Sequence, residues 1–336
     1  MELDPRSLGR TGLKLTPLGF GGTGLGNFYR PVAEAEAGAT VAAAFAGGIR
    51  YFDTAPLYGH GLSEHRLGGA LRAAGAVPIV LSTKVGWRLS PARGADPEAG
   101  HFIDVPPFRR TLDYSYDGVL RSFEDSLQRL GRDRVDILLL HDCDRRNQGD
   151  QYPARFAEAM KGAYPALERL RAEGAVGAIG CGLNEWQACE DFARAGDFDC
   201  FLLAGRYTLL DQASLDSFLP LCIERGIGII LGGPYNSGIL ATGAVAGAFY
   251  DYAPAGSDIL ARARRIEVLC RAHDVPLKAA ALQFPLLHPA VASVIPGVRS
   301  PAEVEENLRL MRQAIPSAFW RALREQGLLR PDAPIA

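Results

Sequence analysis

The sequence lacks several features that would each indicate a particular class of protein. No apolar run approaches the roughly 20 residues that a membrane-spanning helix needs, and the opening MELDPRSLGRTG lacks the apolar stretch of a signal peptide. Neither sign of charge dominates, since 36 basic residues face 38 acidic ones and the net charge is -2. Nothing electrostatic therefore favours nucleic acid or an anionic membrane as a partner. We expect a cytoplasmic protein that binds a small molecule.

Cysteine and histidine are also scarce and unpatterned. The six cysteines form no Cys-x-x-Cys pair and mostly lie in apolar segments, while the six histidines show no metal-ligand spacing. This pattern indicates reduced, buried thiols, and we expect neither a disulfide nor a metal site.

What the sequence does contain is enough apolar mass for a large core. Its hydrophobic fraction is 48% and its charged fraction 22%, which are values of a soluble globular protein. A length of 336 residues allows two domains, but α/β barrels of this size form one unit. The pattern of repeated segments along the chain therefore has to decide between two domains and one.

Short apolar runs recur along the chain, and each is followed by a longer segment with helical periodicity. The runs lie at Thr16 to Phe20, Arg50 to Phe52, Ile79 to Thr83, Val135 to Leu140, Ala178 to Cys181, Cys200 to Ala204, Ile227 to Leu231 and Ala292 to Ile295. Eight such runs is the number in a (β/α)8 barrel. We predict a single TIM-barrel domain spanning residues 1–336.

The segment from Tyr116 to Leu130 illustrates the helical pattern. Its apolar residues form one stripe, Ser115 can cap the start, and Gly131 can supply a left-handed stop. Similar patterns predict helices at Glu34 to Phe45, Ser63 to Ala73, Pro165 to Ala172, Trp186 to Arg194, Leu215 to Glu224, Ile259 to His273 and Ser317 to Leu329.

The remaining segments predict a hairpin and three long loops. Gly9 to Gly12 separates two apolar stretches between Ser7 and Phe20, which suggests a hairpin that closes the lower mouth of the barrel. The connections Gly86 to Ser115, Asp142 to Tyr164 and Gly232 to Ser257 are too long for tight turns. Loops of this length usually serve a site, which in a barrel lies at the carboxyl ends of the strands.

Polar residues stand just past four of the strand-like runs. The segments are Y-F-D-T-A-P-L-Y-G at 51–59, S-T-K-V-G at 82–86, D-I-L-L-L-H at 136–141 and G-L-N at 182–184. Taken singly, Asp53 suits a turn cap, Lys84 a surface charge and His141 a rim histidine. Because strand ends converge on one rim, Asp53, Lys84 and His141 are expected to lie close together, with Tyr58 leaning over them.

In that order and context, Asp53, Tyr58, Lys84 and His141 resemble the catalytic tetrad of the aldo-keto reductases, and the resemblance runs from about Leu8 to about Met311. Members of that family move a hydride between a nicotinamide cofactor and a carbonyl or alcohol. The resemblance implies that Tyr58 is the general acid/base, with its pKa of normally ~10 lowered by Lys84. Asp53 would hold Lys84, and His141 would donate a hydrogen bond to the substrate oxygen.

The same resemblance implies a set of cofactor-binding residues. Gly22 and Thr23 end the first strand, Asn184 would hold the nicotinamide amide, and Tyr207 would stack under the nicotinamide ring, with packing under the next helix as its alternative. Binding of the pyrophosphate and the adenosine is expected from Gly232, Gly233, Tyr235, Asn236, Ser237, Gly238, Ile295, Gly297, Arg299, Glu303, Glu306 and Asn307.

One departure from the family pattern concerns the phosphate of NADP. Relatives that prefer NADPH usually carry a lysine and an arginine where this chain has Gly297 and Glu303. A carboxylate would repel a 2′-phosphate but could accept hydrogen bonds from a bare ribose, although Arg299 could partly restore a phosphate site. We therefore expect NAD to be preferred, with NADP possible.

The substrate expected from the resemblance is a small sugar or aldehyde. Trp87, His141 and Asp142 border the expected pocket, and an aromatic wall with carboxylates suits a neutral polyhydroxyl ring. The motifs S-T-K-V-G-W-R, L-L-H-D and G-G-P-Y-N-S-G-I-L look similar to the aldose 1-dehydrogenases that act on L-fucose, D-arabinose or L-galactose. A pyridoxal 4-dehydrogenase or a general carbonyl reductase is the alternative.

A different class, the cofactor-sensing regulatory subunits of potassium channels, shares this fold. Such a role needs a surface for a membrane partner, and the inserts at Arg145 to Tyr152 and Ala246 to Asp258 are the candidates. Their mixture of polar and aromatic residues favours substrate lids instead. The oligomeric state, monomer or homo-oligomer, stays open.

Overall fold

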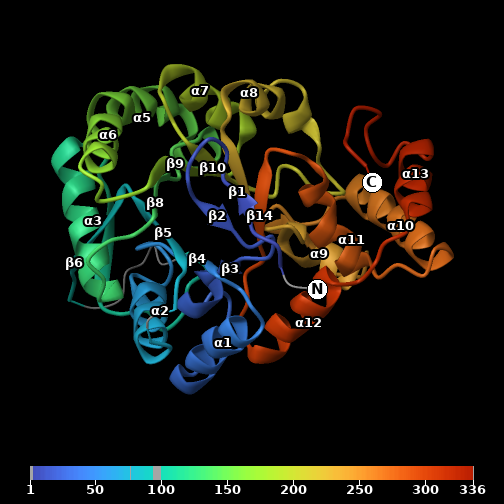
Figure 1. Ribbon diagram of the computed structural model, residues 1–336, viewed down its shortest axis with the longest axis horizontal. Coiled ribbons are helices and arrows are strands. Elements are labelled where there is room, and N and C mark those ends of the chain that lie inside the picture. Colours follow the sequence, from blue (N-terminus) through green and yellow to red (C-terminus); the bar gives the residue numbers. More distant parts are fainter. Residues whose placement is uncertain (1–2, 76, 94–99, 336) are drawn as a thin grey trace.

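Eight parallel strands form a ring at the centre of the molecule (Figure 1). The computed structural model describes residues 3–75, 77–93 and 100–335. The strands of the ring, in their spatial order, are β3 (Phe20–Gly21), β4 (Tyr51–Asp53), β5 (Val80–Val85), β8 (Ile137–His141), β9 (Ala178–Leu183), β10 (Cys200–Ala204), β11 (Gly228–Gly232) and β14 (Val291–Ile295). Parallel bridges from Leu18 to Val294 and from Gly21 to Gly297 join the two edges, so the ring is closed. The predicted (β/α)8 barrel is confirmed.

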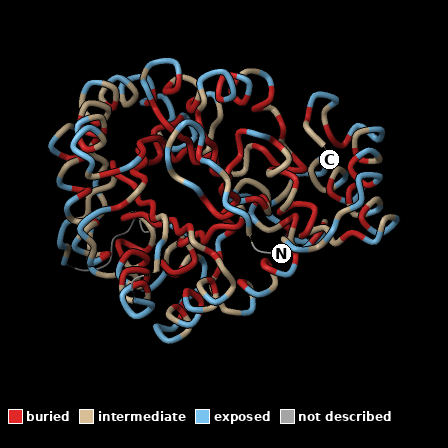
Figure 2. The backbone as a smooth tube through the Cα atoms, viewed as in Figure 1, coloured by how far each residue is buried: buried red, intermediate tan, exposed pale blue. Residues whose placement is uncertain are grey.

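The strands are buried on both faces, as their continuous apolar runs predicted. Strand β8 shows how one run serves two cores. Ile137 and Leu139 belong to the cluster inside the ring, whereas Leu138 and Leu140 pack against the surrounding helices. In Figure 2 the buried strands occupy the middle, and the exposed residues lie on the outer surfaces of the helices.

A layer of helices surrounds the barrel, and most of them match the predicted ranges. Their bounds are α1 (Glu34–Ala46), α2 (Leu62–Ala73), α3 (Tyr116–Leu130), α6 (Tyr164–Ala172), α7 (Trp186–Ala195), α8 (Phe218–Arg225), α10 (Ser257–Ala272), α11 (Leu277–Gln283), α12 (Pro301–Met311) and α13 (Ser317–Glu325). No helix in the described part of the chain is long and apolar enough to cross a membrane.

Two predicted helices have different ends. Helix α8 begins at Phe218 rather than Leu215, because Ala213–Leu215 form a separate 3₁₀ turn, η4. Helix α13 ends at Glu325 rather than Leu329, because Gly327 takes the left-handed conformation that stops a helix.

The N-terminal hairpin is confirmed and lies against the end of the ring where the strands begin. Strand β1 (Arg6–Ser7) pairs antiparallel with β2 (Lys14–Leu15), and Leu8 and Leu15 pack into the inner core. Gly9 has φ 52°, and a Cβ there would lie 2.3 Å from the carbonyl oxygen of Gly226. Only glycine allows so close an approach.

The three long connections follow β5, β8 and β11 and contain short elements of their own. These are β6 (Trp87–Pro91), β7 (Phe108–Leu112), α4 (Arg145–Gln148), η2 (Gly149–Gln151), α5 (Tyr152–Glu158), the π-helical turn η3 (Ala159–Ala163), η5 (Asn236–Gly238), α9 (Ile239–Thr242), β12 (Phe249–Tyr250) and β13 (Ala253–Pro254). Two further turns are η1 (Gly22–Gly26) and η6 (Phe284–Leu287). Residues 94–99 of the first connection lie outside the described residues.

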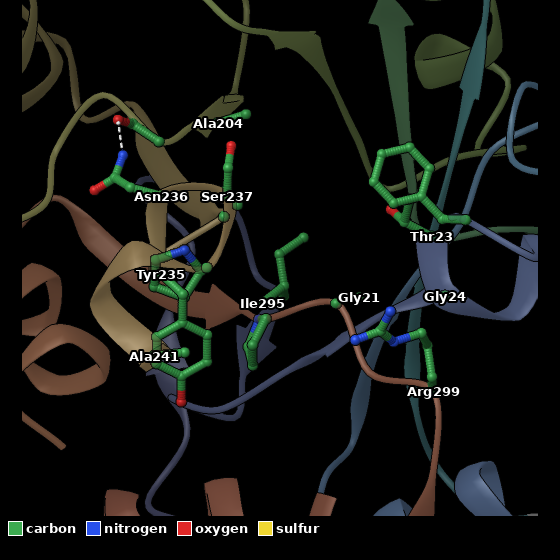
Figure 3. Close-up of a pocket in the computed structure, with 18 of the residues that line it drawn as sticks. Gly21, Thr23, Gly24, Ala204, Tyr235, Asn236, Ser237, Ala241, Ile295 and Arg299 are labelled. Carbon is green, nitrogen blue, oxygen red and sulfur yellow. Dashed lines mark hydrogen bonds between the residues drawn. The ribbon is translucent and has the colours of Figure 1, made fainter. Parts of the chain in front are cut away.

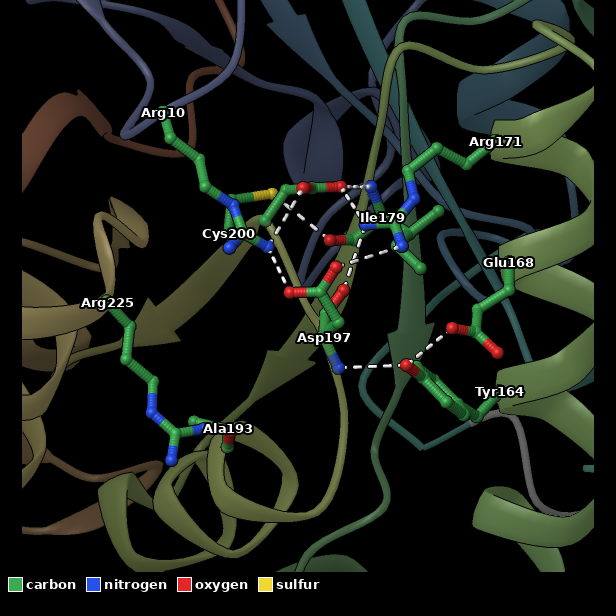
Figure 4. A network of polar contacts seen from close by, with 10 residues as sticks. Arg10, Tyr164, Glu168, Arg171, Ile179, Ala193, Asp197, Cys200 and Arg225 are labelled. Atoms are coloured by element: carbon green, nitrogen blue, oxygen red, sulfur yellow. Dashed lines mark hydrogen bonds and ion pairs between the residues drawn. The ribbon is translucent and has the colours of Figure 1, made fainter.

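A network of ion pairs links the hairpin to the strand starts (Figure 4). Asp199, just before β10, accepts hydrogen bonds at 2.9 Å from the Ile179 backbone N–H and from the Arg171 guanidinium. Arg10 of the hairpin pairs with Asp197 and lies 3.7 Å from Asp199. The side chain of Asp199 is 9% exposed and that of Asp197 is 62% exposed.

This difference in burial predicts different contributions to stability. Asp199→Ala leaves the buried Ile179 backbone N–H without its acceptor and removes the less exposed of the two carboxylates that pair with Arg171, and we expect it to lower the free energy of unfolding by roughly 3 kcal/mol. Asp197→Ala removes only exposed pairs and serves as the matched control, with an expected loss of under about 1 kcal/mol. Urea unfolding followed by circular dichroism measures both, and equal losses would contradict the prediction.

Candidate active site

The site is built around a buried ion pair at the carboxyl ends of β4 and β5. The Lys84 ammonium lies 2.7 and 2.9 Å from the two carboxylate oxygens of Asp53 and also donates to the Thr54 carbonyl oxygen at 2.8 Å. Ser82, paired with Asp53 across the strands, donates a further hydrogen bond to that carboxylate. The two charged side chains are 1% and 2% exposed. The fold therefore buries the Lys84 cation and gives its ammonium group three oxygen acceptors, two from Asp53 and one from Thr54.

Burial and pairing act in opposite directions on this pair. Burial raises the pKa of Asp53 above its usual value, although Lys84 and Ser82 oppose that shift. Burial is the largest single influence on Lys84 and acts to lower its pKa, but the charges of Asp53 and Tyr58 and the hydrogen bonds to them together leave that pKa raised. Lys84 is therefore a permanent cation at neutral pH.

Tyr58 lies on the loop that follows β4, directly against this cation. The Lys84 ammonium is 4.7 Å from the centre of the Tyr58 ring. Burial raises the pKa of Tyr58, while Lys84 and hydrogen bonding to Thr23 act to lower it. The expectation of a lowered pKa was thus wrong for the cofactor-free site, because the cost of burying a phenolate exceeds what one paired lysine offsets.

His141 ends β8 and faces Tyr58 edge-on. The two ring centres are 5.8 Å apart at an angle of 82°, so the side chains from 53, 58, 84 and 141 are brought together as predicted. Burial, with the nearby Lys84 charge, holds the pKa of His141 well below its usual value. The imidazole is therefore neutral and can donate one N–H.

Beside the tetrad, a cleft of about 390 Å³ opens between the loops that follow β3, β11 and β14 (Figure 3). Tyr235, Asn236 and Ser237 lie on one side of it, and Thr23 and Arg299 lie on the other. Asp53 and Tyr58 form part of its wall. The volume of this cleft is in the range of cofactor-binding sites. The cleft extends to Tyr58.

The lining of the cleft fits a dinucleotide. Its glycines include Gly233 and Gly238 with positive φ and Gly297 with open space where a Cβ would stand. The consecutive left-handed residues Asn236 and Ser237 shape a concave backbone of the kind that binds phosphate. The side-chain oxygen of Asn236 is buried and has no hydrogen-bond partner within the described chain, as expected of an acceptor that awaits a ligand donor.

The chain matches the Aldo/keto reductase family over residues 17–326. The protein belongs to this family. It is 45% identical to a pyridoxal 4-dehydrogenase from Microbacterium luteolum, over 97% of this chain and 98% of that protein. It is 40% identical to a D-threo-aldose 1-dehydrogenase from a Pseudomonas species, over 95% and 96% of the two chains. The holo form of aldo-keto reductase AKR11C1 from Bacillus halodurans has the same fold, with a TM-score of 0.77 at 24% identity over 98% and 97% of the chains.

Membership makes this protein an oxidoreductase, and aldo-keto reductases use nicotinamide cofactors. The end of the cleft formed by β14 and α12 carries the residues expected for adenosine. Tyr235 donates to the Asn307 side chain at 2.6 Å, and Lys278 pairs with both carboxylate oxygens of Glu306. Glu303 accepts from the Arg299 backbone N–H at 2.8 Å and lies 3.5 Å from its guanidinium.

Most of the predicted cofactor residues of this aldo-keto reductase line the cleft. Those that do are Thr23, Gly232, Gly233, Tyr235, Asn236, Ser237, Gly238, Ile295, Gly297, Arg299, Glu303, Glu306 and Asn307. Gly22 and Asn184 are not among the lining residues, and a Cβ on Gly22 would lie 2.5 Å from the Asp53 carbonyl oxygen. Gly22 therefore serves the packing of β3 against β4.

The structure corrects the prediction for Tyr207. Its ring is fully buried, with its centre 5.1 Å from that of Phe284 and 5.4 Å from that of His288. Gly205, two positions earlier, lines the cleft, and the chain then turns Tyr207 into the core. Tyr207 is therefore a core residue that packs against the η6 turn, and neither stacking under the nicotinamide nor packing under the next helix describes its ring contacts.

Sequence reasoning missed several lining residues, which lie on the loop after β3, on the third long connection and on α11. Phe28, Tyr29, Asp251, Tyr252 and Lys278 all line the cleft. Tyr252 was noticed as part of an insert, but its direction depends on two consecutive left-handed residues, 251 and 252, which no sequence pattern indicated.

The buried Asp53–Lys84 pair predicts that substitutions of its two residues do not have additive effects on the free energy of unfolding. Lys84→Met leaves the Asp53 carboxylate unpaired and should lower the free energy of unfolding by about 3–5 kcal/mol, whereas Asp53→Asn/Lys84→Met should recover most of that loss. Burial already raises the pKa of Asp53, and Lys84→Met removes the opposing charge. The folded variant then holds the proton more tightly than the unfolded chain, so its deficit should shrink as the pH falls. Denaturant unfolding of the wild type, of both single variants (Lys84→Met and Asp53→Asn) and of the double variant between pH 8 and pH 5 measures both effects, and additive losses would refute the pairing.

Proposed function

We propose that this aldo-keto reductase oxidises the hemiacetal carbon of a small ring, a free aldose of the L-fucose, D-arabinose or L-galactose type, to the lactone. The observation that carries the proposal is the Lys84 ammonium 4.7 Å from the Tyr58 ring at the inner end of a cleft sized for a dinucleotide. The name of the 40% identical relative, D-threo-aldose 1-dehydrogenase, supports the substrate class.

The reaction removes the proton of the hemiacetal hydroxyl and a hydride from the carbon that carries this hydroxyl. Tyr58 accepts the hydroxyl proton as the C–O bond becomes a carbonyl, and Lys84 stabilises the phenolate that this requires. His141 donates its N–H to the reacting oxygen and orients it. A nicotinamide cofactor held by the residues that line the cleft would supply the acceptor for the hydride.

Pyridoxal is a second candidate substrate, because it offers the same reacting group as an aldose, a cyclic hemiacetal. Its hydroxymethyl group lies beside the aldehyde, so in water it closes to a cyclic hemiacetal whose oxidation also forms a lactone. The 45% identity to a pyridoxal 4-dehydrogenase favours it. The aromatic rings near the site also favour pyridoxal. The ring centre of Phe102 lies 6.3 Å from that of Tyr58, and the ring centre of Phe28 lies 5.2 Å from that of Phe102. A flat pyridine ring stacks on such walls as readily as the apolar face of a sugar.

The inserts at Arg145 to Tyr152 and Ala246 to Asp258 contact each other above the cleft. Arg146 pairs with Asp251 and lies 5.3 Å from the centre of the Tyr252 ring, while Arg206 donates to Asp251 at 2.7 Å. Tyr252 also donates its backbone N–H to Ser237 in the cleft. These contacts support a lid over the cofactor rather than a surface for a partner protein.

The proton transfer has a direct test. Wild-type protein with NAD+ should form NADH with L-fucose, L-galactose or pyridoxal, and Tyr58→Phe should lower kcat by at least about 10³-fold, because it removes the group that accepts the proton. Absorbance at the NADH band reports turnover. As a control, Tyr116→Phe removes the same group from the first residue of α3, where the hydroxyl accepts from Arg169 outside the cleft, and should keep full activity. Turnover retained in Tyr58→Phe would refute the mechanism, and no turnover with any of the three compounds would refute the substrate class.

The cofactor preference follows from the pairing of Glu303. Its carboxylate engages both the backbone and the guanidinium of Arg299, so this cation in the cleft wall is already paired with a carboxylate. Helix α12 begins with Ser300 as its cap, and its first turn carries this carboxylate toward the cleft. We therefore propose NAD as the preferred cofactor, and an oxidative direction with it.

This preference predicts the effect of removing one charge. Wild-type kcat/KM should be at least about tenfold higher with NAD+ than with NADP+, and Glu303→Gln should narrow that ratio by freeing Arg299 for a 2′-phosphate. Glu305→Gln, an exposed neighbour on the same helix, is the control and should leave the ratio unchanged. A wild-type preference for NADP+ would overturn the proposal.

A further inference from the structure

Asp142 follows His141 and is held in one orientation by its neighbours. It is buried, and its backbone has φ 57°, a left-handed conformation that aspartate and asparagine tolerate better than most residues. The Trp87 indole N–H donates to Oδ2 at 2.9 Å, and the Asn147 amide donates to Oδ1 at 3.4 Å. Trp87 and Asp142 are not among the residues that line the cleft, so neither side chain is placed to bind the cofactor.

The other neighbour of this carboxylate is the ring of His141. Oδ1 of Asp142 lies 3.5 Å from Nε2 of His141, while Nδ1 of the same ring is buried with no hydrogen-bond partner in the described chain. A proton on Nδ1 would leave a buried donor unpaired and would place the Nε2 lone pair against a carboxylate oxygen. A proton on Nε2 avoids both penalties.

We propose that Asp142 is a positioning residue that keeps the proton of His141 on Nε2, where it can be donated to the substrate oxygen. The proposal rests on the role given above to His141. At 3.5 Å the carboxylate is near enough to favour this tautomer electrostatically, yet too far to hold the proton in a strong hydrogen bond. The N–H thus stays available to the substrate.

The contact between Asp142 and His141 also predicts that activity depends on pH. Burial raises the pKa of Asp142 to about 6, and the Trp87 hydrogen bond and the charges of Lys84 and Arg110 limit that shift. The other ionisable groups that face Asp142 are His141, Asp144, Tyr114 and Tyr252. Below about pH 6 a protonated Asp142 can donate to Nε2, which moves the histidine proton to Nδ1. Activity should therefore fall as the pH drops through about 6.

Asp142→Asn tests the idea because asparagine keeps the size and the backbone conformation. The Trp87 indole, which has a single N–H, should hold the new amide oxygen at the Oδ2 position and so turn the amide NH2 toward Nε2. His141 would then carry its proton on Nδ1. We expect kcat to fall by about 100-fold, as for the loss of one donor to a developing oxyanion, with little change in KM and no acid limb near pH 6.

A second substitution separates this role from a structural one. In Trp87→Phe/Asp142→Asn the amide is free to turn its oxygen toward Nε2, so activity should recover at least about tenfold relative to Asp142→Asn. A failure to recover would overturn the proposal, as would an unchanged kcat in the single variant. Asp133→Asn makes the same chemical change at an exposed position before β8, at the opposite end of the barrel, and should match the wild type.

The tautomer can also be read without turnover. Two-bond ¹H–¹⁵N correlation spectra of protein with ¹⁵N-labelled histidine distinguish Nδ1–H from Nε2–H in the cofactor-free enzyme, and His141→Gln assigns the signal. We expect Nε2–H in the wild type and Nδ1–H in Asp142→Asn; the same tautomer in both would refute the proposal. If no sugar and no pyridoxal is oxidised, the proposed function fails, whereas this spectrum still decides the role of Asp142.

Discussion

The site depends on one constraint, which is that a lysine and an aspartate are kept charged inside a barrel where almost no water reaches them. Burying two ions costs free energy that their attraction only partly returns, so such a pair is not there for stability alone. The cation that Asp53 holds lies against the Tyr58 ring, and in the proposed mechanism it stabilises the phenolate that takes the proton of the substrate hydroxyl.

The rest of the architecture presents this pair to a cofactor. Parallel strands bring Asp53, Lys84 and His141 to one rim, although the chain separates them widely. The loops after β3, β11 and β14 build the cleft beside them, and the insert that carries Asp251 and Tyr252 closes over it through ion pairs with arginines from two other loops. The hairpin and the Asp199 network lie at the opposite end of the barrel, where they hold the strand starts together. The division is typical of barrels.

Much of this could be predicted, and the exceptions have physical reasons. Alternation of apolar runs and helical stripes located the eight strands and most helices, but Leu277–Gln283 is short and rich in alanine, so it has little polar contrast to detect. Tyr207 was misplaced because a family position does not reveal which way the backbone turns after Gly205. The pKa of Tyr58 was misjudged because sequence shows the neighbouring lysine but not the depth of burial, and burial is the larger effect.

The sequence by itself determined the barrel and the glycine-rich segments of the cleft, because these follow from periodicity and local motifs, and its resemblance to the aldo-keto reductases singled out Asp53, Tyr58, Lys84 and His141 as candidates. Only the tertiary structure decided how far each charge is removed from water, which way Tyr207 and Tyr252 point, and that Asp142 lies beside the ring of His141 with Trp87 behind it. Those outcomes depend on distances between segments that are far apart in the chain. Electrostatic energies change steeply with such distances and with burial, and neither is written in the order of the residues.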